Sequence, residues 1–223
     1  MKFSYFLILT FFIASNSWAS KTDFIQVGYQ QVDVDWITSL KPKGVKIVAN
    51  KDIGDFYLEA SYSSTSDDKA AQYENFGTTI VGDFDVDYSM IQLKVGKVIE
   101  LTASSNIDLS VAYEKAHFDG QYKGSRSISD PSNGNRETHF FRYIKDETSK
   151  NISLDLTYNI LAFDSFNFDV SIGGEHKQDI ENKTNFTYGS ELGYWFTKEI
   201  QVNIEYRDTK LVESLSLNLV YKF

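Results

Sequence analysis

The amino-acid sequence predicts an all-β chain that folds as a transmembrane antiparallel up-and-down β-barrel of ten strands, with eight strands as the alternative. Polar and apolar residues alternate with a period of two along most of the chain, and no sustained helical period occurs. Short turns alternate with longer polar segments, as in barrels that cross a membrane. A soluble exported barrel or sandwich stays open as the non-membrane alternative, because alternation alone does not say which face is buried.

The first residues have the features of a signal peptide. Lys2 precedes an apolar run over residues 5–14, and Ser17 and Ala19 form the small-residue pattern of a cleavage site. The apolar run is shorter than the roughly 20 residues that a helical span needs. We therefore expect residues 1–19 to be a signal peptide and residues 20–223 to be one barrel domain.

The composition excludes several kinds of function. Without the leader the chain keeps 21 Lys and Arg against 31 Asp and Glu, a net charge of −10, and nucleic acid binding needs a basic surface. The absence of cysteine excludes disulfides, thiol catalysis and thiolate metal sites. We expect no nucleic acid partner, no cofactor and no metal.

The alternation predicts the strands in chain order. They are expected near residues 24–34, 44–50, 56–64, 84–98, 106–116, 151–160, 166–175, 186–196, 202–207 and 214–223. Short turns are expected near 51–55, 100–106, 162–165 and 197–199, and longer outer loops over 65–82 and 118–147.

The run over residues 84–98 is irregular. Its first part has apolar residues at even positions, such as Val86 and Tyr88, whereas its second part has them at odd positions, such as Ile91 and Leu93. The phase changes by one residue near Ser89. Either a β-bulge or a wrongly assigned register explains this change.

The polar face of the strands carries many charges, which we expect to lie in the lumen. They are Lys46, Glu59, Lys94, Asp108, Glu114, Asp155, Asp169, Glu175, Glu191, Glu205, Arg207 and Lys222. A barrel of about this size is nearly filled by side chains, so the four bases should pair with acids rather than line an open pore. The surplus of acids makes any remaining water path cation-preferring.

The last strand carries a specific pattern. Leu215, Leu217, Leu219, Tyr221 and Phe223 form one apolar face that ends in an aromatic carboxy-terminal residue. In this pattern the chain resembles the small outer-membrane β-barrel proteins of Gram-negative bacteria, of the OmpA-like and OmpX-like class. The resemblance implies an outer-membrane location, a monomer, and a last strand that the barrel-assembly machinery reads as an insertion signal.

Three functions remain for such a barrel. The first is a non-enzymatic structural or surface-interaction role through the outer loops, the second a narrow, porin-like, cation-preferring channel, and the third a rim-located lipid or peptide hydrolase. The hydrolase would need one of His117, His139 and His176, yet sequence spacing fixes no serine or carboxylate beside them. We therefore predict a protein without catalytic residues.

The segment 118–147 is the longest predicted outer loop. It is rich in turn-forming residues and carries five bases, Lys123, Arg126, Arg136, Arg142 and Lys145. Arginine binds phosphate through two parallel hydrogen bonds. We expect this loop to be mobile and to contact outer-membrane lipid and lipopolysaccharide, or another external anionic ligand.

Overall fold

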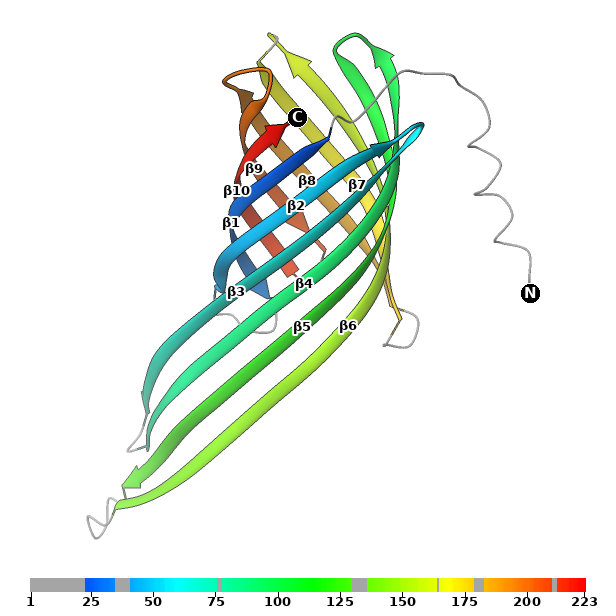
Figure 1. Cartoon of the computed structure of the whole chain (residues 1–223). Helices are drawn as coiled ribbons and strands as arrows, with labels where there is room; N and C mark the ends of the chain where they lie inside the picture. The colour runs from blue at the N-terminus through cyan, green and yellow to red at the C-terminus, as the bar shows by residue number, and fades with distance from the viewer. Residues whose placement is uncertain are drawn as a thin grey trace, which may run out of the picture.

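The computed structural model describes residues 23–34, 41–75, 78–129, 136–163, 165–178, 183–209 and 212–223. The predicted signal peptide lies outside these residues. Within them, ten antiparallel strands form a closed barrel (Figure 1). The strands are β1 Phe24–Val34, β2 Lys43–Ile53, β3 Phe56–Asn75, β4 Thr78–Thr102, β5 Ser105–Ser129, β6 Arg136–Ala162, β7 Phe166–Lys177, β8 Thr184–Trp195, β9 Ile200–Asp208 and β10 Val212–Lys222. The prediction of ten strands is confirmed.

The first and last strands close the barrel. β1 pairs with β10 along its whole length, from Phe24 opposite Lys222 to Val34 opposite Val212. The backbone N–H of Phe223 donates to the carbonyl of Asp23 at 3.1 Å, so the ends of the barrel chain meet at the rim that also carries the short turns. Short turns and both ends of a barrel lie on the periplasmic side, which sets the orientation in the membrane. None of the described residues forms a helix long and apolar enough to cross a membrane.

Large apolar side chains cover the outer wall on all ten strands. Each of the following is at least 40% exposed: Ile25, Val27, Val45, Ile47, Leu58, Tyr62, Ile91, Leu93, Val111, Tyr113, Leu154, Leu156, Phe168, Val170, Leu192, Tyr194, Ile204, Leu217 and Leu219. A soluble protein does not expose an apolar surface of this extent, whereas lipid requires one. The soluble alternative is therefore wrong, and the barrel spans a membrane.

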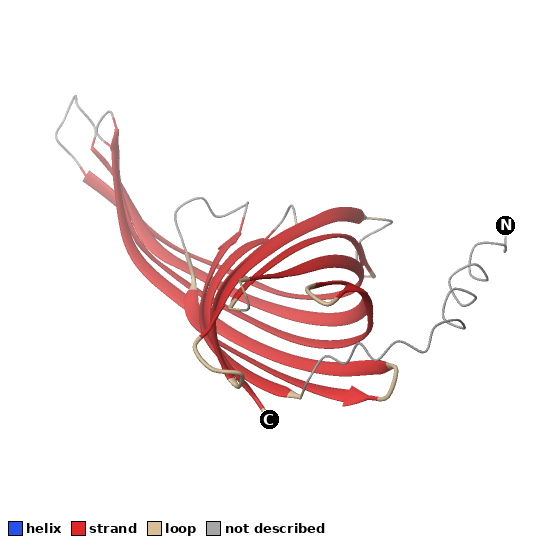
Figure 2. Cartoon of the chain, turned by 90° about the horizontal axis from the view of Figure 1, so that it is seen from above, coloured by secondary structure: helices blue, strands red, loops and turns tan. Residues whose placement is uncertain are grey.

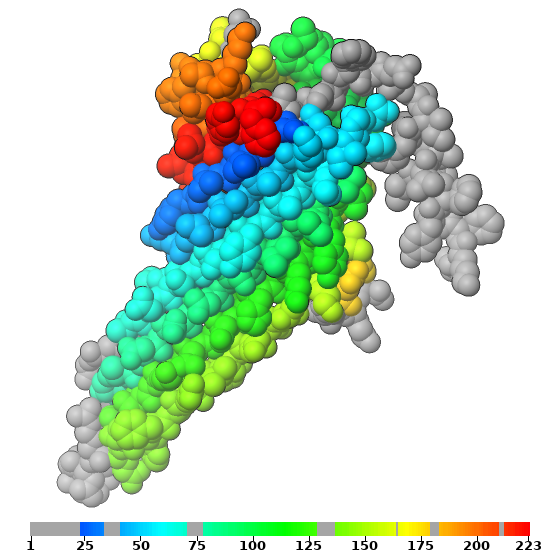
Figure 3. Space-filling model, viewed as in Figure 1, coloured from blue at the N-terminus to red at the C-terminus, as the bar shows by residue number. Residues whose placement is uncertain are grey.

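Four strands are much longer than a membrane crossing requires. β3 to β6 have 20, 25, 25 and 27 residues, against 9 to 12 in the other strands. The pairing of β2 with β3 ends at Ser66, and that of β6 with β7 ends at Asn151. Beyond these points the four strands continue as a sheet that projects from one side of the outer rim (Figures 1, 2 and 3). We call residues 67–75, 78–87, 119–129 and 136–149 the extension.

The extension corrects the prediction of two long outer loops. Residues 65–75 and 78–82 belong to β3 and β4, and most of the segment 118–147 pairs as β5 and β6, from Phe118 opposite Glu147 to Ser129 opposite Arg136. Their glycines, serines and aspartates led to the loop prediction because these residues favour turns. Paired with neighbouring strands, the same residues form regular sheet.

β4 shows where the membrane ends. Its pairing with β3 and β5 is unbroken across Ser89, and its register with β5 shifts only between Glu100 and Thr102. Neither a bulge nor a wrong register therefore explains the phase change near Ser89. Even-numbered residues face the lumen side on both halves of the strand, from Val86 to Gln92.

The apolar residues, not the backbone, change sides at this point. Nearer the periplasm, β4 exposes Ile91 and Leu93 to lipid and buries Gln92, whereas beyond Ser89 it buries Val86 and exposes Asp87. The outer wall needs apolar side chains only where it meets lipid. The phase change therefore marks the outer boundary of the membrane.

Candidate functional site

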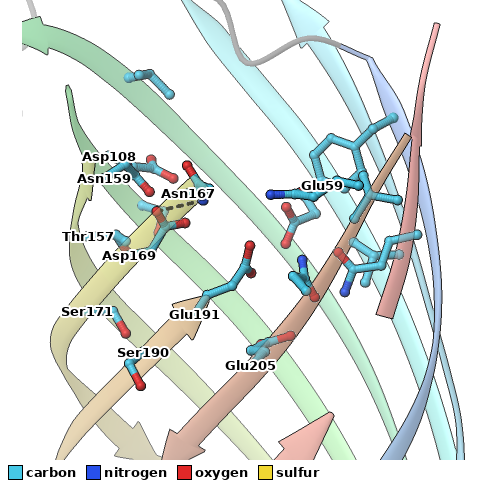
Figure 4. Close-up of a pocket in the computed structure, with 18 of the residues that line it drawn as sticks. Glu59, Asp108, Thr157, Asn159, Asn167, Asp169, Ser171, Ser190, Glu191 and Glu205 are labelled. Atoms are coloured by element: carbon cyan, nitrogen blue, oxygen red, sulfur yellow. Dashed lines mark hydrogen bonds between the residues drawn. The ribbon is translucent and has the colours of Figure 1, made fainter. Parts of the chain in front are cut away.

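The lumen contains a cavity of about 480 Å³ that begins at the periplasmic turns. Ten of the twelve predicted lumen charges line it, and Figure 4 shows Glu59, Asp108, Asp169, Glu191 and Glu205 around this space. The other two, Glu114 and Glu175, lie closer to the outer rim and are only 5% and 2% exposed. All twelve point away from lipid.

Three of the four predicted bases are ion-paired inside the barrel. Lys46 Nζ lies 2.6 Å from Glu205 Oε2, and Lys94 Nζ lies 2.7 Å from Glu59 Oε1. Arg207 Nη2 lies 3.3 Å from Glu114 Oε1 and 3.5 Å from Asp155 Oδ2. Pairing offsets the cost of removing these charges from water.

The fourth base and several surplus acids have other contacts. Lys222 Nζ lies 4.0 Å from the centre of the Trp195 ring, a cation–π contact at the periplasmic end. The hydroxyl of Tyr57 donates to Asp108 at 2.7 Å, and the amide of Asn167 donates to Asp169 at 2.9 Å. Neutral donors thus contact both of these acids.

A cluster of apolar side chains lies at the outer end of the lumen. Val32, Val86, Tyr88, Ala116 and Phe118 form one buried cluster, each at most 9% exposed. Met90 and Val212 pack against it. We call this cluster the apolar seal, and among its members only Met90 also lines the cavity below it.

Buried polar side chains fill the outer end of β6 to β8. Asn151, Glu175, Asn185 and Thr187 are 6%, 2%, 6% and 2% exposed. Glu175 lies 3.9 Å from Lys177, a base that the sequence analysis did not assign to the lumen. With the apolar seal, these side chains occupy the outer end of the lumen. An apolar constriction disfavours water and therefore opposes ion flow.

The histidines are exposed and lie outside the cavity. His117 Nδ1 is 3.2 Å from Thr148 Oγ1 and 3.6 Å from Asp146 Oδ1, so both groups meet the same ring nitrogen. A catalytic triad needs the nucleophile and the carboxylate on opposite nitrogens. His176 contacts Thr184 at 3.2 Å, and His139 lies 3.7 Å from Glu137 at a surface where both side chains are mostly exposed.

The bases of the predicted outer loop lie on both faces of the extension. Lys123 stands opposite Arg142 and Asp83, on the face that continues the outer wall. Arg126 stands opposite His139, and Lys145 opposite Gly120, on the face that continues the lumen wall; Lys145 also lies 2.8 Å from Glu147. The side chain of Arg136 lies outside the described part. The described bases therefore do not form one patch.

The outer face of the extension is dominated by aspartate instead. Asp87, Asp119 and Asp146 stand in one row across β4, β5 and β6, and Asp68 stands opposite Asp85 in the next row. Like charges directly opposite each other destabilise a sheet.

In the described part of the chain, no three His, Asp or Glu side chains are arranged to hold a metal ion.

The inner face of the extension is stabilised by aromatic rings. Phe84 stacks on Tyr122 with ring centres 4.0 Å apart, and Tyr122 contacts Phe141 at 5.1 Å. Tyr122 lies over Gly82, where an added Cβ would approach the ring to 2.4 Å. These contacts explain how a sheet outside the membrane keeps its order without a second layer.

The residues of the predicted insertion signal face lipid. Leu215, Leu217, Leu219, Tyr221 and Phe223 are 49% to 65% exposed.

Sequence reasoning missed the apolar seal, since Tyr88 and Phe118 were assigned to an irregular strand and to a loop. Their even positions, in phase with the lumen-facing Gln92 and Glu114, were the available signal.

No protein-family model matches the sequence, and no curated protein matches it. Among solved structures, the chain is similar to the outer membrane protease OmpT from Escherichia coli, with 11% identity and a TM-score of 0.55 over 94% of this chain and 99% of that chain. It is also similar to Ail, the attachment invasion locus protein of Yersinia pestis (14% identity, TM-score 0.36, 92% and 100% covered), and to Neisserial surface protein A (12%, 0.40, 90% and 97%). Together with the lipid-facing belt, the likeness in fold to OmpT shows that the chain is a small transmembrane β-barrel of the kind found in the outer membranes of Gram-negative bacteria.

Proposed function

We propose that this protein is a non-enzymatic surface-interaction barrel whose recognition element is the extension. The observation that carries the proposal is the length of β3 to β6, which continue outside the membrane as ordered sheet. A barrel needs only about 9 to 11 residues per strand to cross a bilayer. The surplus presents a rigid surface to the exterior, where partners are accessible.

The lumen gives less support to a channel. The apolar seal and the buried Glu175 occupy the outer end of the lumen, whereas the cavity begins at the periplasmic turns. The hydrolase alternative has less support still, because the contacts of His117 leave its second nitrogen without a described partner and His117 does not line the lumen cavity. Changing each of the three histidines to Ala tests this point by assays of lipid and peptide hydrolysis.

A trimmed variant tests the proposed function. Asp67 stands opposite Val86, and Gly120 opposite Lys145, so residues 68–85 and 121–144 can each be replaced by an Asn-Gly turn. The membrane barrel and Val86, Tyr88 and Phe118 of the seal remain. We expect this variant to fold, with heat-modifiable migration on detergent gels, and to lose the adhesion of cells that display it.

The adhesion assay uses three probes: anionic phosphatidylglycerol vesicles, vesicles that carry lipopolysaccharide, and vesicles that carry the same protein. Equal binding of native and trimmed protein to all three would contradict the proposed function.

Contact between the outer loop residues and lipopolysaccharide stays a separate prediction. If it is correct, replacing Lys123, Arg126 and Arg136 together by Ser weakens binding to the anionic vesicles at low salt. The aspartates on the outer face of the extension weigh against binding to an anionic lipid, because like charges repel.

A further inference from the structure

Two lysines face outward next to each other on the barrel wall. Lys115 of β5 stands directly opposite Lys150 of β6, and both side chains are exposed. Their neighbours Glu114 and Asn151 are 5% and 6% exposed and face the lumen, so the lysines point to the outer surface. Two like charges in directly opposite positions repel each other across a sheet. An anion bound between the two ammonium groups replaces this repulsion by attraction.

The two lysines lie just inside the outer boundary of the membrane. Their row continues on β4 with Ile91, which faces lipid, and the next row outward contains Ser89, where the apolar wall ends. A long lysine side chain at such a position keeps its methylene groups against apolar surface and extends its ammonium group to the interface. Lipid headgroups occupy this interface. The anions nearest to Lys115 and Lys150 are therefore lipid phosphates.

The wall around the lysines fits the rest of a lipid molecule. Toward the periplasm, β5 and β6 present an apolar surface on which acyl chains can lie, formed by Val111, Tyr113, Ile152 and Leu154, each 40% to 45% exposed. On the other side of the lysines, His117 and Thr148 share the row of Ser89 and are 3.2 Å apart. Polar side chains thus lie at headgroup level and apolar side chains lie below it.

Both lysines are held by paired backbone. Lys115 pairs with β4 on one side and with β6 on the other. The carbonyl of Lys150 accepts a hydrogen bond from the N–H of Gln178, just beyond the end of β7, at 2.9 Å. Positions fixed in this way lose little backbone freedom when a ligand binds.

The carboxylates on the same face lie farther from the membrane. Asp119 of β5 and Asp146 of β6 are each four residues from the lysine of their strand, roughly 13 Å along it. Asp146 reaches back to His117, at 3.6 Å. The lysines therefore lie in the headgroup layer, and the backbone of the aspartates lies in the water beyond it.

We propose that Lys115 and Lys150 together bind the phosphate of one anionic lipid of the outer leaflet, whose acyl chains lie against the apolar surface of β5 and β6. The lipid belongs to the membrane in which the barrel is inserted. The site is therefore separate from the extension and takes no part in adhesion.

Lipid binding in an uncharged detergent tests the site. Native mass spectrometry counts the phosphatidylglycerol molecules on the folded protein and gives the dissociation constant of the tightest one. Replacing Lys115 and Lys150 together by Gln removes two charges at headgroup level and should weaken this binding roughly tenfold. Replacing both by Arg should preserve it. Phosphatidylcholine, whose headgroup has no net charge, should bind the native protein and the Gln variant equally.

The extension provides a matched control. Lys123 and Arg142 also stand opposite each other on outward positions of β5 and β6, eight residues farther from the membrane on each strand. Replacing both by Gln removes the same charge and should leave phosphatidylglycerol binding unchanged. The trimmed variant, which keeps Lys115 and Lys150, should also bind as the native protein does. Heat-modifiable migration confirms that each variant is folded.

Three results would overturn the inference. The first is equal phosphatidylglycerol binding by the native protein and the variant with Gln in place of Lys115 and Lys150. The second is an equally large loss in the control variant, which would reveal a general effect of charge. The third is that inorganic phosphate binds as tightly as phosphatidylglycerol, which would reveal a site for the free ion. The adhesion of the trimmed variant does not depend on the two lysines, so each of these results leaves the proposed function unaffected.

Discussion

Replacing both Tyr88 and Phe118 by Ser is expected to open the outer end of the lumen to ions. The two rings are central to the apolar seal and are 9% and 7% exposed, with Val32 fully buried beside them. Polar, smaller side chains let water enter the constriction, and a wetted path then joins the cavity to the exterior. In planar bilayers we expect native protein to give no stable conductance and the double variant to give cation-selective channels, because acids outnumber bases in the lumen.

A matched control separates the seal from general disturbance. Asp119→Ser changes the neighbour of Phe118 that faces outward. We expect this variant to stay as silent as native protein. Native channels as large as those of the double variant would show that the seal does not close the lumen. A folded double variant without conductance would show that the polar side chains around Glu175 close it alone.

Phe223→Ala is expected to lower the amount of protein in the outer membrane sharply while export continues. The ring is 65% exposed toward lipid and packs beside Tyr221, with ring centres 6.3 Å apart. Aromatic side chains anchor a barrel at the membrane interface, and the resemblance of the last strand implies that the assembly machinery reads this residue. The amount in outer-membrane and periplasmic fractions is compared by immunoblot.

We expect the position of the Phe223 ring, and not its hydrophobicity alone, to determine the amount of protein in the outer membrane. Phe163→Ala is the control, since Phe163 lies in a turn at the same rim and is 91% exposed. We expect it to leave the level unchanged. Deleting Phe223 should have a larger effect than Phe223→Ala, because deletion also removes the hydrogen bond to Asp23. Normal levels of all variants would mean that the terminal aromatic is no assembly signal.

The membrane-spanning half of the barrel could be predicted from sequence because its two faces meet different surroundings. On β10, Leu217 faces lipid and Asn218 faces the lumen, and this contrast gives the strand, its phase and its membrane location together. The lumen position of charges such as Glu59 and Arg207 follows from the same alternation. Which charges pair could not be predicted, because the contact between Lys46 and Glu205 depends on the closure of the barrel.

The extension could not be predicted because neither of its faces meets lipid. Gly120, Lys123 and Gly124 of β5 show no alternation of polar and apolar residues, so sequence reasoning assigned them to a loop. Their order comes from cross-strand partners such as Phe84 and Phe141, which lie far away in sequence. The contact between His117 and Thr148 could not be predicted either, because the two residues lie far apart in the sequence.

The central claim is that the membrane ends near Ser89 on β4 and that the extension lies beyond it. The sequence has no cysteine, so single cysteines can be placed on the outward positions of this strand, at Asp83, Asp85 and Asp87 and at Ile91, Leu93 and Val95. In sealed vesicles with the extension outside, a membrane-impermeant maleimide should label the three aspartate positions rapidly. The other three should react at least tenfold more slowly, because lipid covers them. Equal labelling at all six positions would contradict this account.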